Sequence, residues 1–263
     1  MLETQNIWEK IQNIQKSCEM ALKEGAFAVP VALGRDVFVL DSKLHPPKVG
    51  FSRKEGQARM LHDLASIELQ AMELGLRTLI EFPEAPEEFR EQLFAVTVSE
   101  GQHLRLCLEG IEDLGFSWGH WPVHCALWDA VSSEDSLLDR ILIVHRYLEG
   151  SGLDAGDHLI RRLEGVEGAG TPLKIMKQIN FEEIGHVDFG STWYREICRR
   201  NRIDAQNDFP ERMETLRYKL PKRMEKINHD LRKKAGFTAE ELRHCEIFRD
   251  SFLPKQQQQG FAL

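Results

Sequence analysis

The feature that most constrains this chain is an ordered set of carboxylates and imidazoles on four segments with helical periodicity. Two glutamates stand alone and two are followed three residues later by a histidine, in the order Glu, Glu-x-x-His, Glu, Glu-x-x-His. The six residues are Glu68, Glu100, His103, Glu149, Glu183 and His186. Each lies on a stripe of apolar side chains, so each carboxylate is expected to be buried. A buried carboxylate needs a cation nearby, either a basic side chain or a metal ion.

The spacing of these residues indicates a helical bundle. Glu68 and Glu100 are 32 residues apart and Glu149 and Glu183 are 34 apart, which suits antiparallel helix pairs with short loops. The 49 residues from Glu100 to Glu149 leave room for a long crossover. Ferritin-like di-metal carboxylate bundles have this order and connectivity. We therefore predict an all-α fold: a ferritin-like four-helix bundle with a long crossover between helices 2 and 3, an irregular N-terminal arm and C-terminal helices.

Periodicity and helix-breaking residues place the elements along the chain. Helices are predicted over residues 4–23, 55–81 and 86–114, from near Ser136 past Glu149, and from Thr171-Pro172 onward; a loop is predicted around Asp208-Phe209-Pro210. The predicted domains are an N-terminal helix and arm packed on the bundle, the di-metal bundle, a basic helical extension and a disordered tail. Their bounds are residues 1–54, 55–200, 201–255 and 256–263.

The ligand types indicate which metal the site would hold. A Glu-x-x-His pair on a helix places carboxylate and imidazole one turn apart on one face, where both can bind the same ion. One such pair occurs by chance on many solvated helices, but two in register, each preceded by a lone glutamate, are specific. Four carboxylates and two imidazoles suit iron or manganese, whereas zinc favours fewer ligands and more His or Cys. We predict two iron ions, with Mn or mixed Mn/Fe as alternatives, and no flavin or NAD site, because the chain has no G-x-G-x-x-G fingerprint.

Other side chains are candidates for roles around these ligands. His145 lies one turn before Glu149 and either orients that carboxylate or is a core histidine bonded to a backbone carbonyl. Gly101 and Gly185 lie within the two Glu-x-x-His quartets, where each either admits a close neighbour to the site or relieves crowding between packed helices. Further candidates for contacts around the ligands, or for catalysis, are His62, His124, Asn180 and Thr97.

The motifs also resemble those of a known family. The stretches concerned are Leu61-His62 through Ile67-Glu68-Leu69-Gln70-Ala71, Ser99-Glu100-Gly101-Gln102-His103, Leu148-Glu149-Gly150-Ser151-Gly152-Leu153-Asp154, Glu183-Ile184-Gly185-His186-Val187 and Lys234-Ala235-Gly236-Phe237. In these stretches, and over most of residues 55 to 240, the chain is similar to the bacterial DUF455 ferritin-like proteins. The resemblance implies a ferritin-like bundle with a di-metal centre. This chain departs from the family at Gly150-Ser151, where Ala-Arg is usual, and at His145, where proline is common.

Composition and charge limit the cellular location and the partners that this protein is expected to have. No apolar run approaches eighteen residues and the N-terminus is acidic, so we expect a cytoplasmic protein without a membrane partner. The five cysteines form no C-x-x-C pair, which argues against a disulfide framework or a zinc ribbon. The net charge of −8 argues against nucleic acid, yet residues 195–234 carry thirteen Lys/Arg against seven Asp/Glu.

Three functions remain open from the sequence. The leading one is a non-haem di-iron oxidase or oxygenase of the hydroxylase type, acting on an unidentified small molecule with an external electron donor, as a monomer or a homodimer. The second is an iron-binding ferroxidase or storage protein, although the segments before and after the bundle argue against a storage cage. The third is an RNA-modifying enzyme similar to tRNA hydroxylases, although charged helices are usually solvated faces. Its candidate polyanion contacts are Arg199, Arg200, Lys222, Arg223, Lys233 and Lys234.

Overall fold

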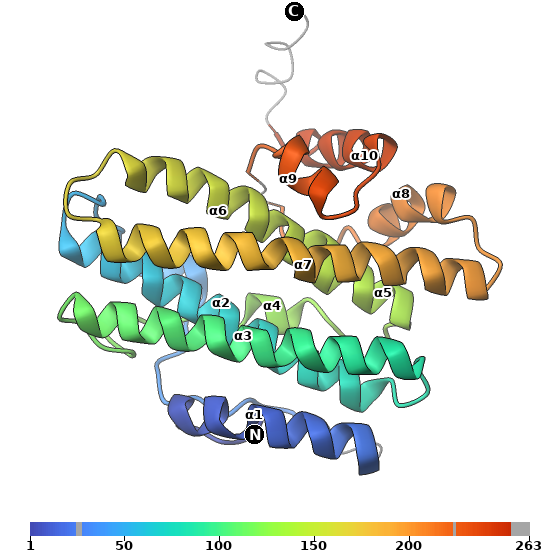
Figure 1. The fold of residues 1–263 in the computed structure, drawn as a ribbon, viewed down its shortest axis with the longest axis horizontal. Helices are drawn as coiled ribbons and strands as arrows, with labels where there is room; N and C mark the ends of the chain where they lie inside the picture. Colours follow the sequence, from blue (N-terminus) through green and yellow to red (C-terminus); the bar gives the residue numbers. More distant parts are fainter. Residues whose placement is uncertain (25–27, 223–224, 254–263) are drawn as a thin grey trace, which may run out of the picture. The chain divides into compact units, whose positions relative to one another are not determined.

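The structure is a computed structural model that describes residues 1–24, 28–222 and 225–253. Helices dominate this part of the chain, and it contains no β-strand beyond an isolated bridge between Val39 and Val123 (Figure 1). The predicted all-α class is confirmed. The predicted disordered tail, residues 256–263, lies outside the described ranges. None of the helices in these ranges combines the length and the hydropathy that a membrane span requires.

The chain divides into two compact units. The first comprises Met1–Ser133 with Ile160–Ile179, and the second comprises Glu134–Leu159 with Asn180–Leu263. Two of the three divisions fall inside helices, α6 (Glu149–Glu164) and α7 (Gly170–Arg200), and the third falls between Ser133 and Glu134, outside any helix.

The first unit is built on two long helices, α2 (Lys54–Glu81) and α3 (Glu87–Asp113), which lie side by side with α1 (Ile7–Glu24) against both (Figure 1). The helix α2 ends at Glu81 because Phe82 precedes a proline, and a residue in that position is disfavoured in the α conformation. Pro86 occupies the N-cap position, one residue before α3, without a side-chain capping hydrogen bond, whereas the sequence pattern placed it in the first turn.

Small residues allow close packing in this unit. A Cβ at Gly75 of α2 would lie 2.2 Å from the Thr97 hydroxyl oxygen on α3. A Cβ at Gly101 would lie 3.3 Å from both Ile14 and Met72. Gly101 therefore relieves crowding between packed helices, which was one of its two predicted roles. Gly185 has no such neighbour among the described residues.

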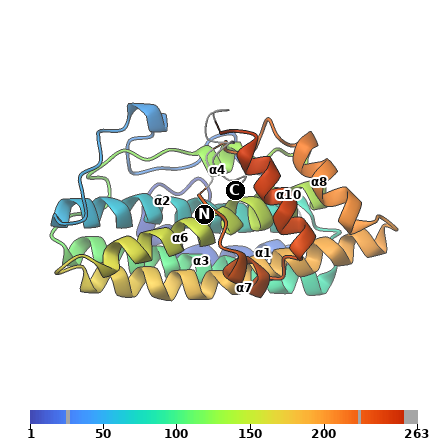
Figure 2. The same cartoon turned by 90° about the horizontal axis from the view of Figure 1, so that it is seen from above.

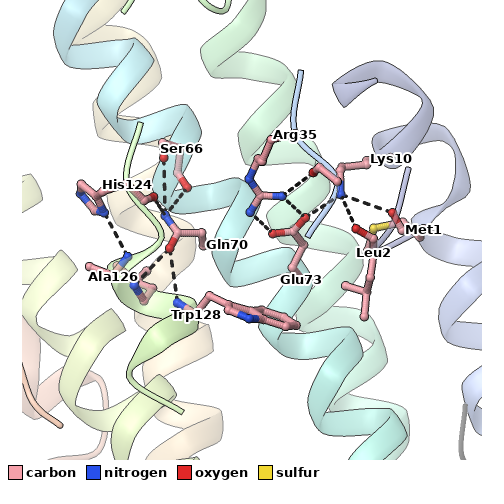
Figure 3. Close-up of polar contacts among 12 residues, drawn as sticks. Met1, Leu2, Lys10, Arg35, Ser66, Gln70, Glu73, His124, Ala126 and Trp128 are labelled. Atoms are coloured by element: carbon pink, nitrogen blue, oxygen red, sulfur yellow. Dashed lines mark hydrogen bonds and ion pairs between the residues drawn. The ribbon is translucent and has the colours of Figure 1, made fainter. Parts of the chain in front are cut away.

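A buried ionic cluster fastens the N-terminal segments to α2. The carboxylate of Glu73 is fully buried and accepts hydrogen bonds from Lys10 Nζ at 2.7 Å and from Arg35 at 2.6 Å (Figure 3). Lys10 also donates to the carbonyl oxygens of Met1 and Leu2 at 3.3 and 3.1 Å. One carboxylate thus holds both α1 and the chain around Arg35, before the short 3₁₀ helix η1 (Ser42–Leu44).

Gln70, one turn before Glu73, fastens the connection that follows α3. Its amide nitrogen donates to the His124 carbonyl at 2.9 Å (Figure 3). Its amide oxygen accepts from the backbone N–H groups of Leu127 and Trp128 at 3.1 and 3.3 Å. These N–H groups belong to the first turn of α4 (Ala126–Asp129), so Gln70 supplies acceptors that the short helix lacks.

The second unit begins with a helix of mixed character. Ser136 caps α5 (Leu137–Ile141) in a capping box with Asp139, as its position before the apolar stripe predicts. The chain then continues as a π-helix, η2 (Leu142–Leu148), before α6. The Glu149 N–H donates to the carbonyl of Val144, five residues back. A helix therefore does run from near Ser136 past Glu149, but its middle part is π-helical, which the apolar pattern did not reveal.

The rest of the second unit contains α8 (Ala205–Thr215), α9 (His229–Lys234) and α10 (Ala239–Asp250). The helix α10 packs against α8 (Figure 2) and also against α9. The loop predicted around Pro210 is wrong, because Pro210 lies inside α8. Asp204 caps this helix, and its buried Phe209 and Met213 provide apolar packing. The cap and the packing outweigh the loss of one backbone hydrogen bond at the proline.

Candidate metal centre

In the first unit, two carboxylates from different helices converge on one imidazole. Glu68 comes from α2, and Glu100 and His103 come from α3. His103 Nδ1 lies 3.3 Å from Glu100 Oε2 and 3.6 Å from Glu68 Oε2. The three side chains are between 0 and 5% exposed. This half of the predicted ligand set is therefore brought together in a buried position.

Cys107 is a neighbour of this cluster that the motif analysis did not single out as a site residue. It is fully buried one turn after His103 on α3. Burial and the charge of Glu68 raise the pKa of the thiol well above its ordinary value, against an opposing effect of His103. The thiol is therefore protonated at neutral pH. Its place four residues after His103, on the same helix face, is the sequence signal that could have identified it.

In the second unit, two His–Glu pairs repeat the one-turn spacing. His186 Nδ1 lies 3.1 Å from Glu183 Oε1 on α7. His145 Nδ1 lies 2.8 Å from Glu149 Oε1, across the junction of η2 and α6. The contact that would orient Glu149 is thus present. His145 also packs edge-on against Phe189, with ring centroids 5.1 Å apart.

Each unit contributes one Glu-x-x-His pair to the predicted ligand set: Glu100 with His103 in the first unit, and Glu183 with His186 in the second. Three of these residues are buried and Glu183 is partly exposed. Two imidazoles and two carboxylates are a donor set that fits iron or manganese. The side chains present therefore fit the metal that the sequence pattern implies.

Two polar candidates, Asn180 and Thr97, are engaged in packing. The Thr97 hydroxyl donates to the Leu93 carbonyl at 2.7 Å and fills the space left by Gly75. Asn180 is buried and fills the space left by Gly156: a Cβ there would lie 2.1 Å from the Asn180 amide oxygen. Any catalytic part for either residue stays a prediction.

His62 lies in an aromatic cluster of the first unit. Its ring stacks on Trp118 with centroids 4.7 Å apart and meets Trp121 edge-on at 5.4 Å. His62 Nε2 accepts a hydrogen bond from the Gly119 N–H at 3.1 Å, which places the ring proton on Nδ1. Burial lowers the pKa of His62 to about 4. The geometry therefore gives this histidine a neutral ring.

His124 has a similar but less buried setting. Its ring stacks on His45 with centroids 6.0 Å apart, and its Nδ1 accepts from the Ala126 N–H at 3.3 Å. Burial is the main cause that lowers the pKa of His124. The roles predicted for His62 and His124 at the metal site remain predictions.

The burial of His62 predicts a pH-dependent stability. The unfolded ring takes up a proton near pH 6.5 and the folded ring only near pH 4, so stability is lost as pH falls through this window. Between pH 7 and pH 5 we expect a loss of about 2 kcal/mol from this residue alone. Urea unfolding at both pH values should show this loss in the wild type and a smaller one in His62→Gln. The exposed His229 supplies the control, because His229→Gln should keep the wild-type difference. Equal losses in wild type and His62→Gln would contradict the assignment.

The basic residues proposed for polyanion contact are dispersed and partly neutralised. Arg199 and Arg200 are exposed and both pair with Glu196 at 2.7 Å. Lys222, Lys233 and Lys234 are exposed, and Arg223 lies outside the described residues. Polyanion binding by these residues therefore stays a prediction without added support.

Comparison with known proteins gives a family without a known activity. A family model described as "Protein of unknown function (DUF455)" matches residues 3–243. An uncharacterized protein of Haemophilus influenzae is 34% identical over 204 residues, which cover 74% of this chain and 70% of that protein. No solved structure matches the chain.

Proposed function

Because the chain belongs to the DUF455 family of unknown function, its activity has to be inferred from the site, and we propose that it is a non-haem di-metal carboxylate oxidoreductase. The metals would be two iron ions, or manganese with or without iron. Their proposed ligands are Glu68, Glu100, His103, Glu149, Glu183 and His186. The ferritin-like arrangement of the four ligand-bearing segments is part of this proposal.

The observation that carries the proposal is the buried convergence of Glu68 and Glu100 on His103. Hard carboxylate oxygens and an imidazole nitrogen in one buried place are the donors that iron and manganese bind. A second Glu–His pair with the same spacing, Glu183 with His186, supplies a matching set of donors. Sharing two ions between two such sets is the arrangement of di-iron carboxylate proteins.

The chain's own side chains would prepare the site for redox chemistry. A bound di-metal centre supplies dioxygen activation, which makes an O2-dependent oxidase or oxygenase of the hydroxylase type the proposed class. The surrounding apolar helix faces would exclude water from the reacting groups. His145 would hold the orientation of Glu149 through their 2.8 Å hydrogen bond. The proposed protein would act on a small-molecule substrate in the cytoplasm. It would receive its electrons from an external donor.

Metal content tests this proposal directly. After anaerobic reconstitution with Fe(II), the wild type is expected to hold two ions per chain by elemental analysis. His103→Ala and His186→Ala should each lose one of them, because each histidine belongs to a different donor set. The exposed His229 gives a matched control, since His229→Ala should keep both ions. One ion or none in the wild type overturns the six-ligand site. If the wild type binds two ions and then oxidises and accumulates further Fe(II) under dioxygen, the ferroxidase or storage function is favoured.

A further inference from the structure

A buried arginine from the C-terminal segment reaches the π-helix of the second unit. Arg232 on α9 is 1% exposed. Its Nε and Nη2 donate to Asp154 Oδ2 at 3.2 and 2.8 Å, and its Nη1 donates to the backbone carbonyl of Arg146 at 3.1 Å. Asp154 lies on α6 and Arg146 lies within η2. One guanidinium therefore ties the π-helix to the helix that follows it.

Gly150 makes this contact sterically feasible. A Cβ at this position would lie 2.0 Å from Arg232 Nη1 and 2.7 Å from the guanidinium carbon. Any side chain at position 150 would push the guanidinium away from the Arg146 carbonyl. Glu149, one of the proposed ligands, is the residue immediately before this glycine.

The same C-terminal segment holds the π-helix at further points. Arg146 Nη1 donates to Glu241 Oε1 on α10 at 2.9 Å, and the Arg146 guanidinium lies 4.4 Å from the Phe237 ring centroid. The Tyr147 hydroxyl donates to the Pro221 carbonyl. A π-helix is rarely stable in isolation and recurs at functional sites, so these contacts indicate an element that its surroundings stabilise.

We propose that Arg232 is a positioning residue that fixes the register of the π-helix and thereby the orientation of His145 and Glu149. The residue inserted by the π-helix changes how side chains before and after it are aligned, since one residue corresponds to a rotation of about 100° in an α-helix. Relaxation of η2 toward an α-helix would turn His145 relative to Glu149 and weaken their 2.8 Å contact. The ligand-positioning part of this inference rests on the proposed function.

Amide hydrogen exchange of the metal-free protein tests the hold on the π-helix. Arg232→Met removes the donors, and Gly150→Ala displaces the guanidinium while keeping it in the chain. Both should accelerate exchange in peptides that span residues 142–151. The matched control is Arg195→Met, because Arg195 anchors the same C-terminal segment through the Gly236 carbonyl and makes no described contact with η2. Unchanged exchange over residues 142–151 in Arg232→Met would overturn the proposal.

Titration with Co(II), followed by its visible absorption, tests the positioning of the ligand. We expect Arg232→Met and Gly150→Ala to bind one of two cobalt ions about 10- to 100-fold more weakly, as for other residues that orient a ligand. Arg232→Lys should fall between these variants and the wild type, because a single ammonium cannot reach both Asp154 and the Arg146 carbonyl equally well. Arg195→Met should bind both ions with unchanged affinity. Unchanged cobalt affinity in Arg232→Met would overturn the ligand-positioning role but not the proposed function. A wild type that binds no cobalt would overturn both.

Discussion

Replacing Glu73 with alanine is expected to lower the free energy of unfolding by about 3–5 kcal/mol, as is typical when one partner of a buried ion pair is removed. Lys10 is 1% exposed, and burial is the main cause that lowers its pKa, with Glu73 opposing that effect. Without the carboxylate, Lys10 and Arg35 would remain as two cations with no anion at their shared contact. Urea denaturation at neutral pH measures the change.

Two further variants separate the loss of an ion pair from the loss of packing. Lys10→Met combined with Glu73→Gln should be less destabilised than Glu73→Ala, because the double variant removes charges of both signs and keeps the volume. Glu164 forms an exposed pair with Lys177, so Glu164→Ala should cost less than about 1 kcal/mol. Similar losses in Glu73→Ala and Glu164→Ala would show that the buried cluster contributes no more than a surface pair.

The sequence was a good guide wherever a structural feature is encoded within one helix. The helix α2 begins one residue before its predicted start and ends at the predicted residue, because its long apolar stripe and Pro83 are both local signals. The pairs Glu100 with His103, Glu183 with His186 and His145 with Glu149 follow from one-turn spacing alone. The approach of Glu68 to His103 needed the additional inference that α2 and α3 pair with matched register.

Features that depend on distant contacts were not predictable from local patterns. The partners of Glu73 are Lys10 and Arg35, which are 63 and 38 residues away along the chain. Arg232 looked like one more member of a basic stretch, yet it is buried against Asp154, 78 residues earlier. Pro210 was predicted to lie in a loop, but it lies inside α8, where the Asp204 cap and the buried helix face stabilise the helix. In each case tertiary packing decided the outcome, and helix propensity or local charge did not.

Metal binding is expected to stabilise the folded protein strongly. At a hundredfold excess of free metal over Kd, a ligand that binds only the folded state contributes roughly 2.7 kcal/mol per site. For a chain of this size, that corresponds to a rise in Tm of roughly 5–10 °C for one site. Differential scanning calorimetry measures this difference in Tm. The wild type is compared without metal, with Fe(II) under nitrogen, and with Mn(II).

The variants Glu68→Gln and Glu149→Gln test whether the difference in Tm between metal-loaded and metal-free protein depends on these carboxylates. Each variant should reduce this difference, because an amide is a poorer ligand for these metals than a carboxylate. Without metal, Glu68→Gln should be at least as stable as the wild type, since it removes repulsion from Glu100 around His103. Glu164 is exposed, so Glu164→Gln should leave the difference in Tm between metal-loaded and metal-free protein unchanged. If the metal-free wild type melts as high as the metal-loaded form and both Gln variants are clearly destabilised, the carboxylates serve ordinary buried ion pairs with protein cations, and the proposed oxidoreductase function fails with the metal site.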